Sequence, residues 1–336
     1  MNVKKFLSIF LSVLVIISFC FSGCKINKVN SHLDFVGFSY LPEELILSNP
    51  VTIGNQIYFL EHITENIFNV SISNYTTERR DTERREYDLC LLGSYFPETI
   101  LKYPVSMCSD DDNNLFVLEA GNDIDKQIGY IPKLRLVPSN SNYQYPVHIR
   151  AIYANGEIKA ISNLHLRLKE LEDVKEARKI RYLSDYLIVM FEDLNSLLFI
   201  KKDSFETNTL SYFMIELPQK PIDFDTGKET FVVLLEDSTL LRYEYNSKND
   251  NFTIKTKCKL DNRINNGGLI FLENENIIII YNIGKEKIHI IKNDKQDTMK
   301  IKGLLNIFKL KVNDSERIVA IRKENRIENN IIYEIR

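Results

Sequence analysis

Tryptophan is absent from this chain of 336 residues, although the chain contains 17 tyrosines and 19 phenylalanines. Many carbohydrate-binding sites use tryptophan because it offers the largest rigid face for stacking against a sugar ring. The absence therefore disfavours a carbohydrate-binding function without excluding one, because tyrosine can also stack.

A strong excess of charge of either sign is also missing. The chain has 43 Lys and Arg against 46 Asp and Glu, which gives a formal net charge of −3. Proteins that bind nucleic acids or other polyanions carry a basic surface that this balance does not supply. We therefore expect no nucleic-acid partner.

Cysteines are few, and their spacing matches no framework. Of the five, Cys20 and Cys24 lie near the N-terminus, which leaves Cys90, Cys108 and Cys258 for the folded body. An odd number without a CxxC pair is neither a disulfide framework nor a zinc site. The sequence predicts buried thiols, and the alternative is a disulfide between Cys90 and Cys108 across neighbouring strands.

Motifs of the common catalytic and cofactor-binding sites are missing too. The five histidines never occur at HxH or HxxxH spacing, and no GxSxG sequence is present. Gly227-Lys228 lacks the other residues of a phosphate-binding loop. His148 and His289 each lie between β-branched apolar residues, which indicates packed or hydrogen-bonded side chains. We therefore predict no catalytic residue, no cofactor and no metal site.

Two polar segments invite a functional interpretation. Asp110, Asp111 and Asp112 could offer oxygens to calcium, but no EF-hand spacing follows them. Aspartates also favour turns because their side chains bond their own backbone, and we interpret this segment as a solvated turn. Residues 77–86 repeat Thr-Glu-Arg-Arg with four arginines against four acids, which predicts an exposed loop or hairpin of no net charge.

The N-terminus has the organisation of a secretory signal. Lys4 and Lys5 precede an apolar run at residues 6–21, and the chain becomes polar directly after Cys24. The run has sixteen residues, whereas a spanning helix needs about 20. No later apolar stretch approaches that length, so the remainder is expected to be soluble.

The end of this segment, Phe21-Ser22-Gly23-Cys24, resembles the lipobox of bacterial lipoprotein signal peptides, with Phe21 where that family usually has Leu. The resemblance implies that residues 1–23 are a signal peptide, recognised through Phe21, Ser22 and Gly23, and that Cys24 carries lipid. Several acyl chains on one cysteine give a durable anchor, whereas one chain binds only marginally. The protein would then be held on the extracytoplasmic face of the cell membrane. Plain secretion and an uncleaved anchor remain the alternatives.

Beyond a polar linker at residues 24–34, short apolar runs recur in pairs, which predicts β-hairpins. Asn155-Gly156 lies between two such runs and is a strong hairpin signal. Runs such as 277–280 do not alternate with polar residues, so both faces of those strands should be buried. The seven candidate hairpins join residues 57–60 with 67–72, 115–118 with 128–131, 147–153 with 158–161, 187–190 with 197–200, 231–235 with 240–245, 277–281 with 288–291, and 318–321 with 331–333.

The spacing of these hairpins favours a β-propeller. The last four gaps between first strands are 40, 44, 46 and 41 residues, which is the length of a propeller blade. Few partners are separated by enough residues for the crossover helix of a parallel sheet. We therefore predict an all-β propeller at residues 35–336, with six or seven four-stranded blades.

Two details refine this expectation. Leu164, Leu168, Leu171 and Val174 have the spacing of one helical face, which predicts a short helix or helical insertion extending over residues 169–178. The last blade would lack its outer strand, since the chain stops soon after residues 331–335. A strand at residues 35–40 or 45–47 would complete that blade and close the ring.

Residues 109–118, Ser-Asp-Asp-Asp-Asn-Asn-Leu-Phe-Val-Leu, resemble the repeats of NHL-type and sensor-type propellers, and residues 154–161 look like a second, degenerate copy. The resemblance implies a fold but no site. Without a catalytic motif, the favoured function is a binding or scaffold module for a protein, peptide or envelope component. The alternative is a hydrolase or lyase that acts on a cell-wall or imported polymer in the propeller channel.

Overall fold

The computed structural model describes the chain as an almost entirely antiparallel β protein. The described strands form six four-stranded sheets, here called sheets I to VI. The described residues are 35–42, 47–53, 56–61, 66–71, 89–91, 104–120, 147–171, 176–207, 209–260, 264, 267–292, 295–312, 315–323 and 329–335.

The first three sheets follow one another along the chain. Sheet I contains β2 (Leu47–Ile53), β3 (Gln56–Glu61), β4 (Asn66–Ser71) and β5 (Leu89–Leu91). Sheet II contains β6 (Pro104–Ser109), β7 (Leu115–Ala120), β8 (Val147–Ile152) and β9 (Ile158–Ile161). Sheet III contains β10 (Ala177–Leu183), β11 (Tyr186–Phe191), β12 (Ser196–Lys201) and β13 (Tyr212–Glu216).

The other three sheets follow, and the last one also takes a strand from the N-terminal part. Sheet IV contains β14 (Pro221–Thr226), β15 (Thr230–Leu235), β16 (Thr239–Asn246) and β17 (Asn251–Lys259). Sheet V contains β18 (Gly268–Leu272), β19 (Ile277–Asn282), β20 (Lys287–Lys292) and β21 (Lys295–Lys300). Sheet VI contains β22 (Leu304–Val312), β23 (Ser315–Lys323), β24 (Asn329–Ile335) and β1 (Phe35–Pro42).

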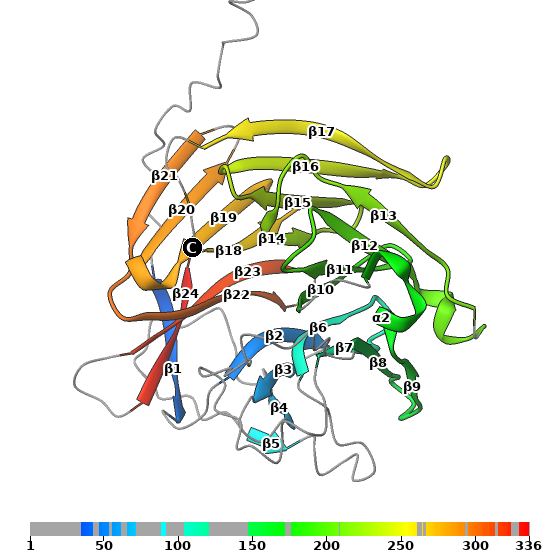
Figure 1. Ribbon diagram of the computed structural model, residues 1–336. Helices are drawn as coiled ribbons and strands as arrows, with labels where there is room; N and C mark the ends of the chain where they lie inside the picture. Colours follow the sequence, from blue (N-terminus) through cyan, green and yellow to red (C-terminus); the bar gives the residue numbers. More distant parts are fainter. Residues whose placement is uncertain are drawn as a thin grey trace, which may run out of the picture.

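The sheets are arranged in a ring around their first strands. Each of β2, β6, β10, β14 and β18 contacts the first strand of the next sheet, and β22 contacts both β18 and β2. Figure 1 shows β10, β14, β18 and β22 toward the middle of the molecule and β17 and β21 at its periphery. The all-β propeller predicted from the sequence is confirmed, with four strands in each of the six sheets among the described residues.

Burial follows this arrangement. All six residues of β11 are buried, and so are all six of β15, because each lies inside a sheet that is covered on both faces by neighbouring sheets. No residue of the outermost strand β17 is buried. This difference explains why the inner runs of the sequence lack the alternation of a strand with one wet face.

The N-terminal strand closes the ring as predicted. β1 pairs antiparallel with β24, from Phe35 opposite Ile335 to Pro42 opposite Asn329, and so supplies the outer strand of sheet VI. The alternative segment at residues 45–47 does not take this position, since Leu47 begins β2.

One hairpin prediction is wrong. β7 pairs with β8, not with residues 128–131, which lie outside the described residues. The runs at residues 115–118 and 147–153 therefore belong to one sheet. Two of the seven candidate hairpins thus merge into sheet II, and the hairpin around Asn155-Gly156 joins its last two strands.

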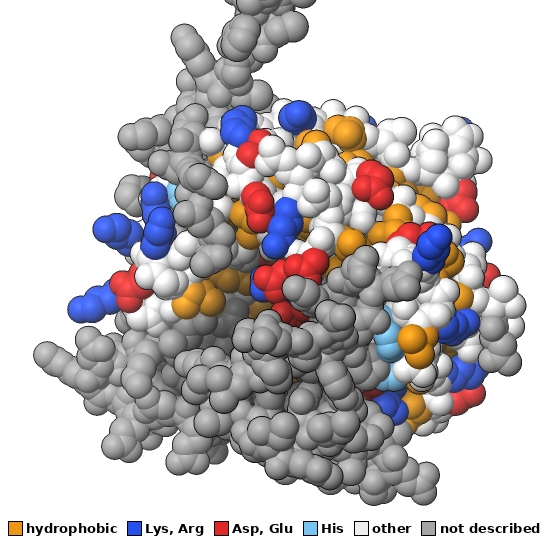
Figure 2. All heavy atoms as spheres, viewed as in Figure 1, with side chains coloured by type: hydrophobic (Ala, Val, Ile, Leu, Met, Phe, Trp, Pro, Cys, Tyr) orange, Lys and Arg blue, Asp and Glu red, His pale blue; other side chains and the backbone are white. Residues whose placement is uncertain are grey.

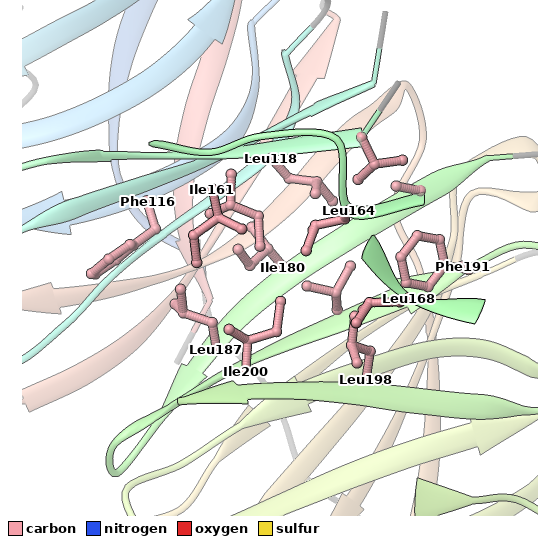
Figure 3. Packing of buried hydrophobic residues seen from close by; sticks show 14 of the residues in the cluster. Phe116, Leu118, Ile161, Leu164, Leu168, Ile180, Leu187, Phe191, Leu198 and Ile200 are labelled. Atoms are coloured by element: carbon pink, nitrogen blue, oxygen red, sulfur yellow. The ribbon is translucent and has the colours of Figure 1, made fainter. Parts of the chain in front are cut away.

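The predicted helical insertion is shorter than expected. It consists of α2 (Leu164–Arg167) and the 3-10 turn η3 (Lys169–Leu171). Leu164, Leu168 and Leu171 are buried and cover the gap between sheets II and III, where Figure 3 shows Leu164 and Leu168 beside Ile161 and Leu198. The helix does not extend to residue 178, because β10 begins at Ala177. Within the described part of the chain, no helix is long and apolar enough to cross a membrane.

Candidate ligand-binding channel

A cavity of about 1070 Å³ lies along the axis of the ring. Its walls come from the first strand of all six sheets and from the turns that follow several of them. Cavities of this size accommodate organic ligands and cofactors. We call this cavity the channel.

One side of the channel carries paired charges. Lys179 of β10 donates to Asp223 of β14, with 2.6 Å between Nζ and Oδ1. Two residues further along the same strands, Arg181 Nε donates to Asp225 Oδ1 at 2.9 Å. These two ion pairs join sheets III and IV.

The same carboxylates also bind the backbone of sheet V. Asp223 Oδ2 accepts the Leu269 N–H at 2.6 Å, and Asp225 Oδ2 accepts the Phe271 N–H at 2.9 Å. Both N–H groups belong to β18, so each aspartate connects three neighbouring sheets. A hydrogen bond to a charged acceptor is stronger than one between neutral groups, and these contacts hold the first strands in register around the axis.

Lys309 of β22 extends the network to sheet VI. Its ammonium donates to the carbonyls of Thr226 and Phe271, at 2.9 and 3.1 Å. It also lies 3.3 Å from Glu316 Oε1 and 3.7 Å from Asp225 Oδ2. The ionic core of the channel thus contains three cations and three carboxylates, which balance.

Asp225 stays ionised because it faces several cations. Burial alone would raise the pKa of Asp225, but the charges of Lys309, Arg181 and Lys179 hold it at about 2. Burial lowers the pKa of Lys179, and Asp223 opposes that shift. Asp225 is therefore a fixed negative charge at neutral pH and not a group prepared to exchange protons.

The wall of the channel also includes apolar side chains. Val105 and Met107 come from β6, Val51 from β2, Ile270 from β18 and Ile307 from β22. The channel therefore offers apolar side chains together with fixed charges. Acidic and basic side chains are also interspersed on the outer face in Figure 2, without a large area of one sign in its described part.

Tyr281 enters the channel from the second strand of sheet V. It pairs with Gly268 in the β18–β19 ladder, and its ring lies where a side chain at Gly268 would project. Burial and the nearby charge of Asp223 raise the pKa of its phenol, so the hydroxyl keeps its proton at neutral pH. Glycine at residue 268 is what lets the phenol lie across β18.

Gly267 makes a similar approach to backbone, which gives a testable consequence. A Cβ at this residue would lie 2.8 Å from the Tyr281 carbonyl oxygen. We expect Gly267→Ala to lower the free energy of unfolding by about 1 to 3 kcal/mol, measured by urea denaturation. Gly284→Ala is the control, because its nearest atom would lie 3.7 Å away. Equal effects of the two substitutions would contradict the packing argument.

The aspartate turn that drew attention in the sequence lies at the end of β6. Asp110 is buried and accepts the N–H groups of Asp112 and Asn114, at 3.0 and 2.8 Å. Lys202 lies 2.7 Å from both Asp110 and Asp112. The interpretation as a turn is confirmed, but a fully solvated turn is wrong for Asp110. No group of His, Cys, Asp and Glu side chains arranged to hold a metal ion occurs among the described residues.

Cys108 resolves one alternative from the sequence. It is a free thiol, buried in sheet II, so the disulfide with Cys90 is wrong. Burial raises the pKa of this thiol, which keeps it protonated and unreactive.

Cys108 should therefore resist alkylation until the protein unfolds. We expect iodoacetamide at pH 8 to leave the Cys108 peptide unmodified in the native protein and to label it fully in urea, as read by mass spectrometry. The half-buried Cys258 provides an internal comparison. Rapid native labelling of Cys108 would contradict the buried position.

The described histidines are packed as expected. His289 is buried, with Nδ1 3.1 Å from Gln296 Nε2, and burial lowers its pKa to about 4. His148 and His165 each accept a backbone N–H, from Asn163 and Val147. None of these three lines the channel.

Several predicted sites fall outside the described residues. Phe21, Ser22, Gly23 and Cys24 are among them, as are His32, His62 and the repeat at residues 77–86. The lipid anchor therefore stays a prediction.

The charged residues of the channel were not predicted from the sequence. The signal was available in two short alternating runs, Lys179-Ile180-Arg181 and Asp223-Phe224-Asp225. Alternation of charged and apolar residues usually indicates a strand with a solvent-exposed face. Here that face borders the channel.

Comparison with known proteins supports the fold. No protein-family model matches the chain, and no curated protein matches it in sequence. The structure of virginiamycin B lyase from Staphylococcus aureus is similar, with a TM-score of 0.51 and 12% identity over 90% of this chain and 99% of that one. Apo AztD from Citrobacter koseri gives a TM-score of 0.44 and 12% identity over 76% and 73% of the chains. The N-terminal domain of Nup159 gives 0.45 and 11% over 88% and 78%. The likeness to virginiamycin B lyase, at 12% identity, supports the β-propeller fold alone.

Proposed function

We propose that this protein is a lipid-anchored, extracytoplasmic binding module that holds a peptide or a small envelope component in its channel. The anchor is lipid on Cys24, and the sequence Phe21-Ser22-Gly23-Cys24 supports it. The propeller is the soluble body that the anchor keeps at the cell membrane.

The observation that carries the binding function is a large channel whose charged side chains are already paired with one another. Lys179, Arg181 and Lys309 are each bound to a carboxylate or to backbone carbonyls. A channel with prearranged charges can bind a ligand without reorganising its walls, which favours affinity.

The alternative, a hydrolase or lyase, has less support. A general acid or base needs a pKa near the working pH, whereas the pKa of Asp225 is held at about 2. No histidine is found among the described residues that line the channel.

Anchoring is tested by labelling the cells with palmitate. The wild-type protein should take up label and sediment with membranes, and Cys24→Ala should do neither. Cys20→Ala controls for the loss of a cysteine in the same segment. Label on Cys24→Ala would refute lipidation at this residue.

Binding in the channel is tested with an envelope extract. Native mass spectrometry of the detergent-solubilised full-length protein should show an added mass after exposure to the extract. Ser109→Trp, which places a large ring in the channel, should abolish this mass, and Ser162→Trp on the exposed surface should not. A bound mass that survives Ser109→Trp would place the ligand elsewhere.

A further inference from the structure

Asp223 and Asp225, the two aspartates of the ionic core, use both of their carboxylate oxygens for contacts within the protein. Asp223 Oδ1 accepts from Lys179 and from the Phe224 N–H, and Asp223 Oδ2 accepts from Leu269. Asp225 gives one oxygen to Arg181 and the other to Phe271. These two aspartates are therefore satisfied from within the protein, whereas Oε2 of the third carboxylate, Glu316, is buried and has no hydrogen-bond partner among the described residues.

Hydrogen-bond donors of the same core remain open. Arg181 uses Nε for Asp225 and Nη1 for the carbonyls of Ile180 and Met107. No hydrogen bond of its Nη2 occurs among the described residues, and the Arg181 side chain lines the channel and is 24% exposed. A guanidinium with one open edge is suited to an oxyanion.

Two further residues with hydrogen-bond donors, Lys179 and Tyr281, line the same channel. Lys179 donates one ammonium proton to Asp223, and its buried side chain also lines the channel. The Tyr281 hydroxyl lines the channel close to Asp223 and Arg181. Three hydrogen-bond donors therefore line the same cavity. Lys179 and Arg181 come from β10 of sheet III, and Tyr281 comes from β19 of sheet V.

The charge balance limits what these donors can bind. With three cations against three carboxylates, the core has no excess positive charge to neutralise a multiply charged anion. The lining also provides the apolar side chains of Met107, Val105 and Ile270. A ligand with a single acidic group and an apolar body would match both the donors and these side chains.

We infer that the channel recognises an organic monocarboxylate, whose carboxylate is bound by Arg181, Lys179 and Tyr281 and whose apolar part packs against Met107 and Ile270. The inference rests on the proposed function, since it names the ligand class of the same channel. It goes further in assigning three residues that determine specificity.

The test uses three probes with the same leucine side chain. N-acetylleucine carries a carboxylate, N-acetylleucinamide is its neutral counterpart, and leucinamide is a cation. Isothermal titration of the full-length protein in detergent should show that N-acetylleucine binds about 10-fold or more tightly than the amide. Leucinamide should be the weakest of the three.

Variants then identify the donors. Tyr281→Phe removes only the hydroxyl and should weaken N-acetylleucine about 10-fold while leaving the amide less affected. Arg181→Lys keeps the charge but loses the open guanidinium edge and should weaken it by a similar factor. Tyr243→Phe is the matched control, because Tyr243 stacks on Phe231 and does not line the channel. Thermal unfolding of each variant confirms that it is folded.

Each outcome decides the matter. Preference for the acid that is lost in Tyr281→Phe and kept in Tyr243→Phe supports the inference. Equal binding of acid and amide, an unchanged Tyr281→Phe, or no binding of any probe overturns it. In those last cases a mass that is captured from envelope extract and lost in Ser109→Trp would still support the proposed function, so the two failures are distinguishable.

Discussion

Replacing Asp225 by asparagine is expected to lower the free energy of unfolding by about 3 to 5 kcal/mol, measured by urea denaturation at pH 7. The carboxylate is buried and faces Arg181 at 2.9 Å and Lys309 at 3.7 Å. Asparagine retains an oxygen for the Phe271 N–H, but it leaves the half-buried Arg181 without its counter-charge and leaves Lys309 with Glu316 alone. Loss of one partner from a buried ion pair is costly because the remaining charge is not resolvated.

The same residue predicts a pH dependence. Its pKa is about 2 in the folded protein, below the ordinary aspartate value of 3.8, so the folded state favours the ionised form. The stability that Asp225 contributes is present above about pH 4 and is lost as the pH falls toward 2. The difference between wild type and Asp225→Asn should therefore shrink by about 2 to 3 kcal/mol between pH 5 and pH 2.

Asp203→Asn is the matched control for both measurements. Asp203 is exposed at the start of the short 3-10 helix η4 (Lys202–Phe205), and its substitution should change stability by less than about 0.5 kcal/mol. A wild-type-like stability of Asp225→Asn at pH 7 would show that the ion pairs of the channel contribute little to the fold.

Deletion of residues 35–42 should have the second large effect. It removes β1, the outer strand of sheet VI, and exposes the edge of β24 along its whole length. Among the described residues, β1 is the only strand of this sheet that comes from the N-terminal part of the chain, so the deletion leaves the contact between β22 and β2 as the remaining closure of the ring. We expect the melting temperature to fall by about 10 °C or more, measured by circular dichroism, and the open edge to promote association.

Deletion of residues 25–34 provides the control, because it shortens the linker and removes no described strand. Its melting temperature should match that of the full-length chain. If the deletion of residues 35–42 left the melting curve unchanged, closure by β1 would not contribute to stability.

The second and third strands of most sheets could be predicted from the sequence because they are buried on both faces. β11, β15 and β19 appear as uninterrupted apolar runs, since neighbouring sheets cover them on each side. Burial of this kind needs no knowledge of which strand lies beside which. The closing strand was also predictable, because the last sheet would otherwise lack a member.

The first strands were missed for a physical reason. β10 and β14 place one face on the core and the other on the channel, where charged residues are stabilised by partners from other sheets. Lys179 and Asp223 are 44 residues apart in the sequence, and no local pattern indicates that they meet. The merger of two predicted hairpins into sheet II depended in the same way on a long-range pairing, between β7 and β8.

The sequence by itself determined the all-β class, the four-stranded repeat and closure by the N-terminal strand. Buried strands appear as apolar runs, and the blades recur at regular intervals, so both can be recognised from neighbouring residues alone. The sequence also supplies the expectation of lipid on Cys24. Only the tertiary structure decided that Lys179, Arg181, Asp223, Asp225 and Lys309 converge in one channel. Electrostatic partners are selected by distance in space, and the ring brings together strands from sheets III, IV, V and VI that the chain order keeps apart.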